Sequence, residues 1–307
     1  MIPEFEIENG VLKKYHGDGR NVIIPEGVTS IGKGAFSRCT GLTDVSFPES
    51  VTSIGNGAFE YCTGLTGISF PEGVETIGDC AFGCCTELTS VILPQTVREI
   101  NWMAFVGCTA LTAVTLPEGL TFIGEWAFGE CSALKEINIP ETVTDIYDNT
   151  FVDCIRLTNL TLPENIRFVY DTAFSGCKNL MLHYRGYSFK ANSSVSADRI
   201  LTMLKYQDFF GVSLTKDAPL LFNLALSSPE EDNFKAYLRE HSEEMLFSLI
   251  DRQDILTIRQ VLGTFITEQN INALIQYAIE QKAYDIQILL TDYKYQHFHF
   301  NQNHLKL

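Results

Sequence analysis

Apolar and polar positions in the first half of the chain follow one pattern that repeats every 23 residues. In the unit that begins at Cys39, Val45 and Phe47 alternate with polar residues, and this period of two is typical of a half-buried strand. Pro48 comes next, and because proline has no N–H to donate, it ends the strand. The first part of each unit therefore predicts one short strand.

The second part of the unit predicts a brief helical turn. Gly55 permits a change of chain direction, and Ala58, Phe59 and Cys62 then lie at helical spacing on one face. Each unit thus directs Leu, Val, Phe, Val, Ile, Ala, Phe and Cys toward an interior.

The period holds through seven units, so that the same residue types form columns. These columns are Pro25, Pro48, Pro71, Pro94, Pro117, Pro140 and Pro163; Phe36, Phe59, Phe82, Phe105, Phe128, Phe151 and Phe174; and Cys39, Cys62, Cys85, Cys108, Cys131, Cys154 and Cys177. A strict period of this length indicates one supersecondary unit copied and stacked, because a single unit cannot bury its own apolar face.

Stacking in register brings the predicted strands side by side. We expect them to form one parallel sheet along a solenoid, with the short helical turns on another side. The predicted strands are Val22–Ile24, Val45–Phe47, Ile68–Phe70, Val91–Leu93, Val114–Leu116, Ile137–Ile139 and Leu160–Leu162.

The motif C-x-x-L-x-x-V-x-x-P-x-x-V-x-x-I-x-x-x-A-F-x-x-C resembles the BspA-like class of bacterial leucine-rich repeats, over residues 21 to about 185. The preceding segment Phe5–Gly19 is similar to the N-terminal capping hairpin of such arrays, with Asn9-Gly10 as its turn. The resemblance implies binding, since members of the class serve as adhesins and recognition modules and not as catalysts. Many members are exported and anchored at the surface, a feature that this sequence does not show.

The repeat register fails after Leu180, where His183 replaces the strand valine and Arg185 replaces its apolar partner. From about residue 198, apolar residues recur at spacings of three and four, which predicts helices. The chain is therefore expected to be an α+β repeat protein, with a leucine-rich-repeat solenoid followed by an all-α helical-hairpin domain. The expected divisions are a capping hairpin at 1–20, the solenoid at 21–188, a linker at 189–197 and the helical domain at 198–307.

The helical part carries its own weaker repeat. Residues 246–262 align without gaps on residues 274–290, a shift of 28 that predicts two stacked helical hairpins. Residues 273–290 are similar to the two-helix core of an ankyrin repeat, although the usual T-P-L-H turn and the glycine between the helices are missing. An irregular helical cap is the alternative.

Composition narrows the function. The net charge of −16 and the pI near 4.7 argue against binding to duplex nucleic acid or to acidic membranes. Seven of the nine cysteines occupy one repeat column, which favours buried free thiols and a reducing compartment. Residues 1–8 lack the basic and apolar regions of a signal peptide, so we expect a soluble, cytoplasmic protein with no membrane insertion. The alternative is a cell-surface or secreted protein whose export signal lies outside this sequence.

Columns that vary between repeats are where a binding surface can be written. Large aromatic residues and arginine replace Ser and Gly in the later repeats, and these residue types dominate interface energetics. The predicted partner-binding residues are Arg98, Trp102, Phe122, Trp126, Tyr147, Arg167, Phe168 and Tyr170. For Phe168 and Tyr170, in the last full repeat, docking of the helical domain is an equal alternative.

The exposed positions of the predicted sheet are small and polar. They could admit an extended peptide or a glycan, and a solvated surface explains them equally well. These positions are Asp44, Ser46, Gly67, Ser69, Ser90, Thr115, Glu136, Asn138, Asn159 and Thr161.

Catalytic and metal-binding motifs are absent from the sequence. The cluster Cys80, Cys84 and Cys85 has neither a second cysteine pair nor a histidine beside it, and His297, His299 and His304 form only a short tail. We therefore predict a non-enzymatic scaffold with no cofactor and no metal, which binds a protein or peptide through the variable face of the solenoid. A surface adhesin for a host protein or glycan is the alternative.

Overall fold

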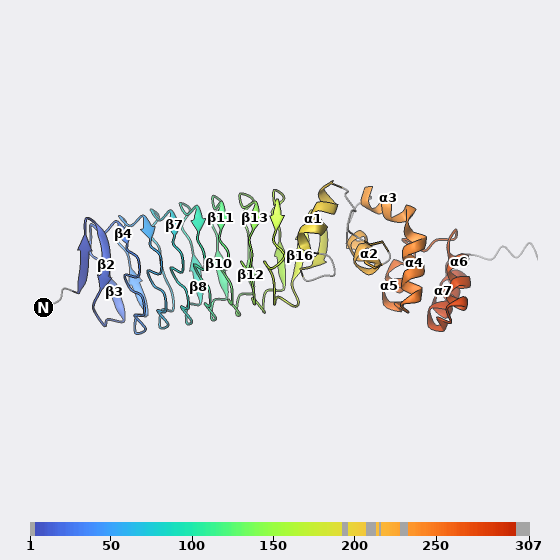
Figure 1. Ribbon diagram of the computed structural model, residues 1–307, viewed down its shortest axis with the longest axis horizontal. Coiled ribbons are helices and arrows are strands. Elements are labelled where there is room, and N and C mark those ends of the chain that lie inside the picture. Colours follow the sequence, from blue (N-terminus) through green and yellow to red (C-terminus); the bar gives the residue numbers. More distant parts are fainter. Residues whose placement is uncertain (1–3, 192–195, 207–212, 215, 228–232, 299–307) are drawn as a thin grey trace, which may run out of the picture. The chain divides into compact units, whose positions relative to one another are not determined.

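The computed structural model describes residues 4–191, 196–206, 213–214, 216–227 and 233–298. The chain divides into two compact units, one of residues 1–185 with 190–198 and one of residues 186–189 with 199–307. The first unit is a β-solenoid and the second is helical, as the sequence predicts (Figure 1). Residues 192–195 of the predicted linker lie outside the described residues.

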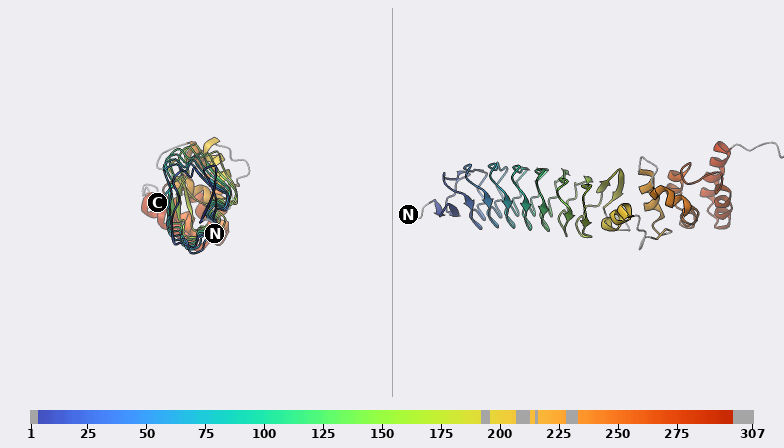
Figure 2. Two further views of the ribbon diagram at one scale, coloured as in Figure 1. Left: turned by 90° about the vertical axis from the view of Figure 1, so that its left-hand side faces the viewer. Right: turned by 90° about the horizontal axis from the view of Figure 1, so that it is seen from above.

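Successive rungs of the solenoid stack in parallel, and they superpose when the solenoid is seen end-on (Figure 2). The predicted strands form, displaced by about one residue toward the N-terminus, and make up a first strand column. Its members are β3 (Asn21–Ile23), β5 (Asp44–Ser46), β8 (Ser90–Ile92), β10 (Ala113–Thr115), β12 (Glu136–Ile137), β14 (Asn159–Thr161) and β16 (Met181–Tyr184).

Each rung also has a second strand, which the sequence analysis missed. These strands are two residues long, too short to show an alternation of apolar and polar residues. The second strand column consists of β4 (Ser30–Ile31), β6 (Ser53–Ile54), β7 (Thr76–Ile77), β9 (Glu99–Ile100), β11 (Phe122–Ile123), β13 (Asp145–Ile146) and β15 (Phe168–Val169).

An antiparallel hairpin precedes the second column. Strands β1 (Phe5–Glu8) and β2 (Val11–Tyr15) are joined by Asn9 and Gly10, whose φ angles of 50° and 78° suit a tight turn. Strand β2 then pairs in parallel with β4, so that the hairpin continues the sheet of the solenoid.

The prediction of one continuous sheet in the first column is wrong. Strand β3 pairs with β5, β8 with β10 and β12, and β14 with β16, and the ladder is interrupted between these groups. In the third rung only Ser69 forms a bridge, to Ile92. Gly67 occupies the first strand position there, and a glycine without a side chain to pack weakens a strand.

The helical turn predicted after Gly55 takes the form of hydrogen-bonded turns that also join neighbouring rungs. The amide of Ala58 donates to the Gly55 carbonyl at 3.1 Å, whereas the amide of Gly57 donates forward to the Asp79 carbonyl at 2.7 Å. Gly57 and Tyr61 have φ angles of 61° and 60°, which interrupt any continuous helix. Alternate amides are therefore satisfied within the rung and by the next rung.

The phenylalanine column forms the predicted core. Rings from Phe36 to Phe174 stack with neighbouring planes within 8° of parallel and centroids 4.9 to 5.7 Å apart. Burial of each ring contributes about 1.5 to 3 kcal/mol, and stacking adds about 1 kcal/mol per pair.

The cysteine column has a second role beside packing. Each thiol from Cys62 onward donates a hydrogen bond of 3.0 to 3.2 Å to the carbonyl of a core phenylalanine one rung earlier, for example Cys62 to Phe36. A cysteine is small enough for this interior and supplies the weak donor that alanine lacks.

The last rung differs from the prediction. Leu182 lies opposite Leu160 in the pairing of β16 with β14, a step of 22 residues instead of 23. Leu182 and Tyr184 are therefore the buried residues, and His183 does not take the place of the strand valine. A deletion of one residue restores the inward pattern, which a fixed 23-residue register cannot show.

The second unit contains the short strand β17 (Tyr187–Lys190) at its beginning, and helices follow. The helices are α1 (Ala197–Tyr206), α2 (Ala218–Ser227), α3 (Asn233–Glu240), α4 (Ser242–Asp251), α5 (Ile255–Val261), α6 (Ile271–Glu280) and α7 (Tyr284–His297). Helices α4 and α5 form one hairpin, α6 and α7 form the next, and α4 packs on α6.

The helical repeat is 29 residues, not the predicted 28. Helices α4 and α6 begin at Ser242 and Ile271, and the turn residues Gln253 and Lys282, both with left-handed φ, match at the same step. Apolar residues recur at three and four along a helix, so an alignment displaced by one residue still matches many of them. The similarity to ankyrin repeats stays a prediction.

Truncation of a core ring should destabilise the solenoid. We expect Phe105→Ala, at a fully buried position, to lower the free energy of unfolding by about 3 to 5 kcal/mol. Urea unfolding followed by tryptophan emission reports on this unit, because both tryptophans of the chain, Trp102 and Trp126, lie in it. Ile155→Ala, at a position 57% exposed, is the control and should change the free energy by less than about 0.5 kcal/mol. Equal effects would contradict the core assignment.

Buried thiols should make stability depend on pH. Burial raises the pKa of Cys62 to about 12 and of Cys177 to about 11. A thiol in the unfolded chain ionises near pH 8.5, so this stabilisation is complete below that pH and is lost as the pH rises. We expect the urea midpoint to fall between pH 8 and about pH 10. A thiol reagent at pH 8 should modify only the partly exposed Cys39, Cys80 and Cys84 in the folded protein; uniform reaction of all nine thiols would contradict this account.

Candidate functional site: an aromatic surface on the second strand column

Four of the predicted aromatic residues lie at or just after the second strand column. Phe122 is in β11 and Phe168 in β15, while Tyr147 and Tyr170 directly follow β13 and β15. The ring of Tyr147 lies between two others, 5.4 Å from Phe122 and 5.5 Å from Tyr170, centroid to centroid. Residues 48 positions apart in sequence thus form one continuous aromatic contact.

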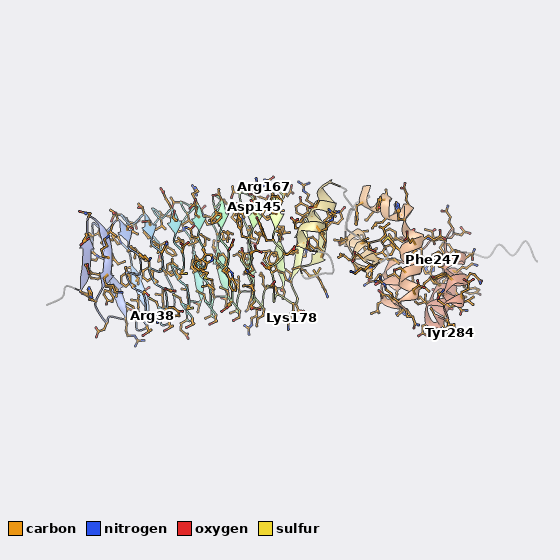
Figure 3. All side chains as sticks on the ribbon, in the orientation of Figure 1. Arg38, Asp145, Arg167, Lys178, Phe247 and Tyr284 are labelled. Atoms are coloured by element: carbon orange, nitrogen blue, oxygen red, sulfur yellow. The ribbon has the colours of Figure 1, made fainter. Side chains whose placement is uncertain are left out.

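Arg167 is held beside these rings. Its guanidinium lies 5.9 Å from the Phe168 ring centroid, and its Nη2 donates to Asp145 Oδ2 at 3.3 Å. Asp145 also accepts a hydrogen bond from Thr144 Oγ1 at 2.5 Å. Figure 3 shows Arg167 and Asp145 together at the edge of the solenoid that carries β11 and β13, whereas Arg38 and Lys178 lie at the opposite edge. We call Phe122, Tyr147, Arg167, Phe168 and Tyr170 the aromatic patch.

The aromatic patch is open to solvent at its C-terminal end. Phe168 is 52% and Tyr170 43% exposed, while Phe122 and Tyr147 are half-buried beneath and beside them. A pocket beside the two exposed rings is lined by Phe168, Val169, Tyr170, Asp171 and Asp198. The patch therefore offers large apolar surface next to a fixed cation and carboxylates.

Burial, together with the nearby Asp145 carboxylate, raises the pKa of the Tyr147 hydroxyl. The hydroxyl thus stays protonated at neutral pH and can both donate and accept a hydrogen bond. This arrangement can bind a partner through stacking, apolar contact and hydrogen bonds.

Three predicted residues do not join the patch. Trp102 is 46% exposed and contacts no other aromatic ring among the described residues. Trp126 has a φ of 60° and folds its ring toward Gly129, where a Cβ would come within 2.8 Å of Trp126 Cε3. Arg98 donates to the carbonyls of Gln95 and Val97 in its own turn, at 2.8 and 3.2 Å.

Asp145 was missed by sequence reasoning. It stands in a column that reads Ser, Ser, Thr, Glu, Phe, Asp and Phe, so its charge looks like ordinary surface variation. The signal that could have found it is Arg167, located 22 residues later, which the stacking brings to the neighbouring rung.

The rungs under the patch are more widely spaced than the first rungs. Core ring centroids are 4.9 Å apart between Phe36 and Phe59, but 5.7 Å apart between Phe151 and Phe174. The second strand column is also interrupted between β11 and β13, where the Phe122 and Tyr147 rings meet. Bulky side chains thus occupy positions that Ser53 and Gly55 fill in the second rung.

No group of three or more His, Cys, Asp or Glu side chains suited to a metal ion occurs in the part of the chain that the structure describes. Burial and nearby acidic residues raise the pKa of Cys80, and burial raises that of Cys84, so neither is an activated thiolate. His299 and His304 of the predicted tail lie outside the described residues. Among the described helices, none combines the length and apolar character needed to cross a bilayer.

Comparison with known families agrees with this geometry. The model described as "BspA type Leucine rich repeat region (6 copies)" matches residues 6–132 and 53–181, which together exceed half of the chain. The chain belongs to the BspA-type leucine-rich-repeat family. Leucine-rich-repeat solenoids of this family are typically scaffolds, and the repeated Phe and Cys columns are the family's core. No curated protein matches the chain.

Solved structures of bacterial leucine-rich-repeat proteins share the BspA-type solenoid. The T. pallidum leucine-rich repeat protein is 34% identical with a TM-score of 0.53, and the match covers 55% of this chain and 82% of that one. A Bacteroides ovatus protein is 32% identical with a TM-score of 0.54, covering 60% and 52%. A Eubacterium ventriosum protein, 22% identical with a TM-score of 0.52, shares the fold over 62% and 50%. The match thus spans about half the length of the last two proteins.

Proposed function

We propose that the protein is a non-enzymatic interaction scaffold that binds a protein partner through the aromatic patch. The repeat columns of the core hold the rungs in place and take no part in recognition. Partner choice is then encoded by the side chains that vary from rung to rung on the outside.

The observation that supports this most strongly is the connected aromatic series Phe122, Tyr147 and Tyr170 with Arg167 at its edge. Aromatic residues and arginine are the types that contribute most binding energy at protein interfaces. Rigid rings on a rigid sheet also lose little conformational entropy on binding, because their rotamers are already fixed by contact with each other. The polar rim formed by Asp145 and Asp171 suits hydrogen bonding around such a centre.

The proposed location is the cytoplasm of a bacterial cell. The free cysteines support a reducing compartment, because six of the seven in the repeat column are buried as thiols.

Replacement of patch residues by those of an earlier rung tests the binding site without disturbing the core. Phe168→Ser with Tyr170→Gly writes the residues of the second rung, Ser53 and Gly55, into the last full rung. We expect the urea midpoint to stay nearly unchanged, because both side chains are largely exposed. Capture of the partner from native lysate, followed by titration with the purified partner, should show at least about a tenfold loss of affinity.

The matched control for the patch variant is Trp102→Asn, which writes the second-rung residue Asn56 into the fourth rung, outside the patch. Unchanged affinity in both variants would contradict a role for the patch. Loss of affinity in the control alone would move the binding surface to Trp102.

Cell fractionation tests the proposed location. An antibody to the helical unit should detect the protein in the soluble cytoplasmic fraction, with a cytoplasmic enzyme as marker. Recovery from the envelope, together with cleavage by protease added to intact cells, would contradict this location and favour an adhesin.

A further inference from the structure

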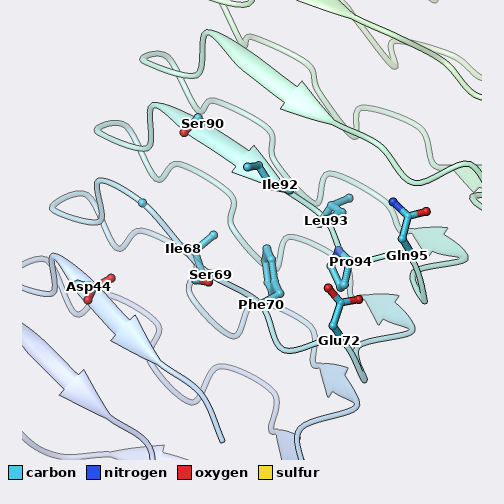
Figure 4. A pocket seen from close by; sticks show the side chains of 11 residues that line it. Asp44, Ile68, Ser69, Phe70, Glu72, Ser90, Ile92, Leu93, Pro94 and Gln95 are labelled. Atoms are coloured by element: carbon cyan, nitrogen blue, oxygen red, sulfur yellow. The ribbon is translucent and has the colours of Figure 1, made fainter. Parts of the chain in front are cut away.

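The first strand column has a hollow that the proposed function does not use. It has a volume of about 570 Å³ and lies where the third rung fails to form a strand. Asp44 of β5 stands on one wall, Glu72 and Gln95 stand on the other, and Ser69 lies between them (Figure 4). Ser90 and Ile92 of β8 complete the lining.

The hollow exists because the strand residue is a glycine. Gly67 stands where Asp44 and Ser90 stand in the neighbouring rungs, and a Cβ built on Gly67 would meet no atom within 4 Å. The missing side chain and the interrupted ladder together leave space between β5 and β8. The cavity is thus built into the stacked backbone and does not depend on the rotamer of a surface side chain.

The walls carry negative charge and no positive charge. Among the described residues, neither the Asp44 nor the Glu72 carboxylate has a hydrogen-bond or ion-pair partner, and no Lys or Arg lines the hollow. Arg98 is the only Lys or Arg between residues 39 and 134, and its guanidinium is bound to its own turn. The same segment carries eleven carboxylates: Asp44, Glu49, Glu60, Glu72, Glu75, Asp79, Glu87, Glu99, Glu118, Glu125 and Glu130. The field around the hollow therefore favours a cation.

The lining also fits an apolar stem. Ile92 is 69% exposed, an unusual position for a large aliphatic side chain on a polar sheet face. Lysine and arginine place their methylene groups on apolar surface while the charged head reaches polar groups. The Ser69 and Ser90 hydroxyls and the Gln95 amide can hydrogen-bond the main chain of an extended segment.

We propose that this hollow binds a lysine or arginine side chain within a basic, extended segment of a protein partner. The charged head pairs with Asp44 and Glu72, and the stem lies on Ile92. This binding site is independent of the aromatic patch, so its failure leaves the proposed function untouched.

Titration of the full chain with a fluorescein-labelled peptide of alternating arginine and serine tests the proposal by fluorescence anisotropy. Asp44→Asn with Glu72→Gln removes the charges and keeps the shape, and we expect affinity to fall at least about tenfold. The matched control is Glu136→Gln with Glu118→Gln, which removes two carboxylates from the same two repeat columns in rungs outside the hollow. The control should change affinity less than about twofold.

A second variant fills the hollow without changing charge. Gly67→Val meets no neighbouring atom and suits a strand, so the urea midpoint should not fall, while affinity for the arginine peptide should drop about tenfold. The same peptide with citrulline in place of arginine should not bind, since it lacks the charge.

Three results would overturn the proposal: no binding of the arginine peptide to the wild-type chain, equal losses in the Asp44/Glu72 variant and its control, or full affinity of Gly67→Val. Spermine serves as a competitor. If it bound as tightly as the peptide and with the same dependence on Asp44 and Glu72, the ligand would be a free polyamine and the peptide assignment would be wrong.

Discussion

The repeated contact between rungs is the interaction on which the rest of the solenoid depends. A rung of 23 residues has two strand residues on one side and three on another, too few to stand alone. Stacking supplies what it lacks: Phe59 packs between Phe36 and Phe82, and Gly57 donates its amide to the next rung. Because the contact is the same at every step, the sequence must repeat wherever it faces inward or bonds forward, and it is free to vary elsewhere.

That division explains how much the sequence could predict. The Phe, Cys and Pro columns require no knowledge of geometry, since each residue is set by the same neighbour one rung away. The second strand at Ser53–Ile54 could not be predicted, because two residues carry no period and the pairing is defined only by the rungs on either side. The one-residue deletion before Leu182 was hidden for a related reason: a fixed register reads through it and places His183 at the wrong position.

The two binding surfaces show the same limit. Aromatic substitutions in the later rungs are visible as breaks in a column, so Phe122, Tyr147, Phe168 and Tyr170 could be named from sequence. Their contacts could not, and neither could the pairing of Arg167 with Asp145, nor the folding of Trp126 onto Gly129. Gly67 was visible only as one more small residue on a polar face, because a hollow is a property of the space between rungs and not of any residue. In the helical unit, the step of 29 is fixed by the turns at Gln253 and Lys282, whereas the apolar pattern alone tolerates a neighbouring alignment.

The uniform register also makes the solenoid a graduated ruler. The hollow belongs to the third and fourth rungs and the aromatic patch to the fifth to seventh, so a whole number of repeats separates them along the axis. Duplication of one 23-residue unit between them would lengthen that separation by a single rung, about 5 Å, and leave every interior contact in place. Spacing between two recognition elements can thus be inherited in discrete increments, independently of their chemistry.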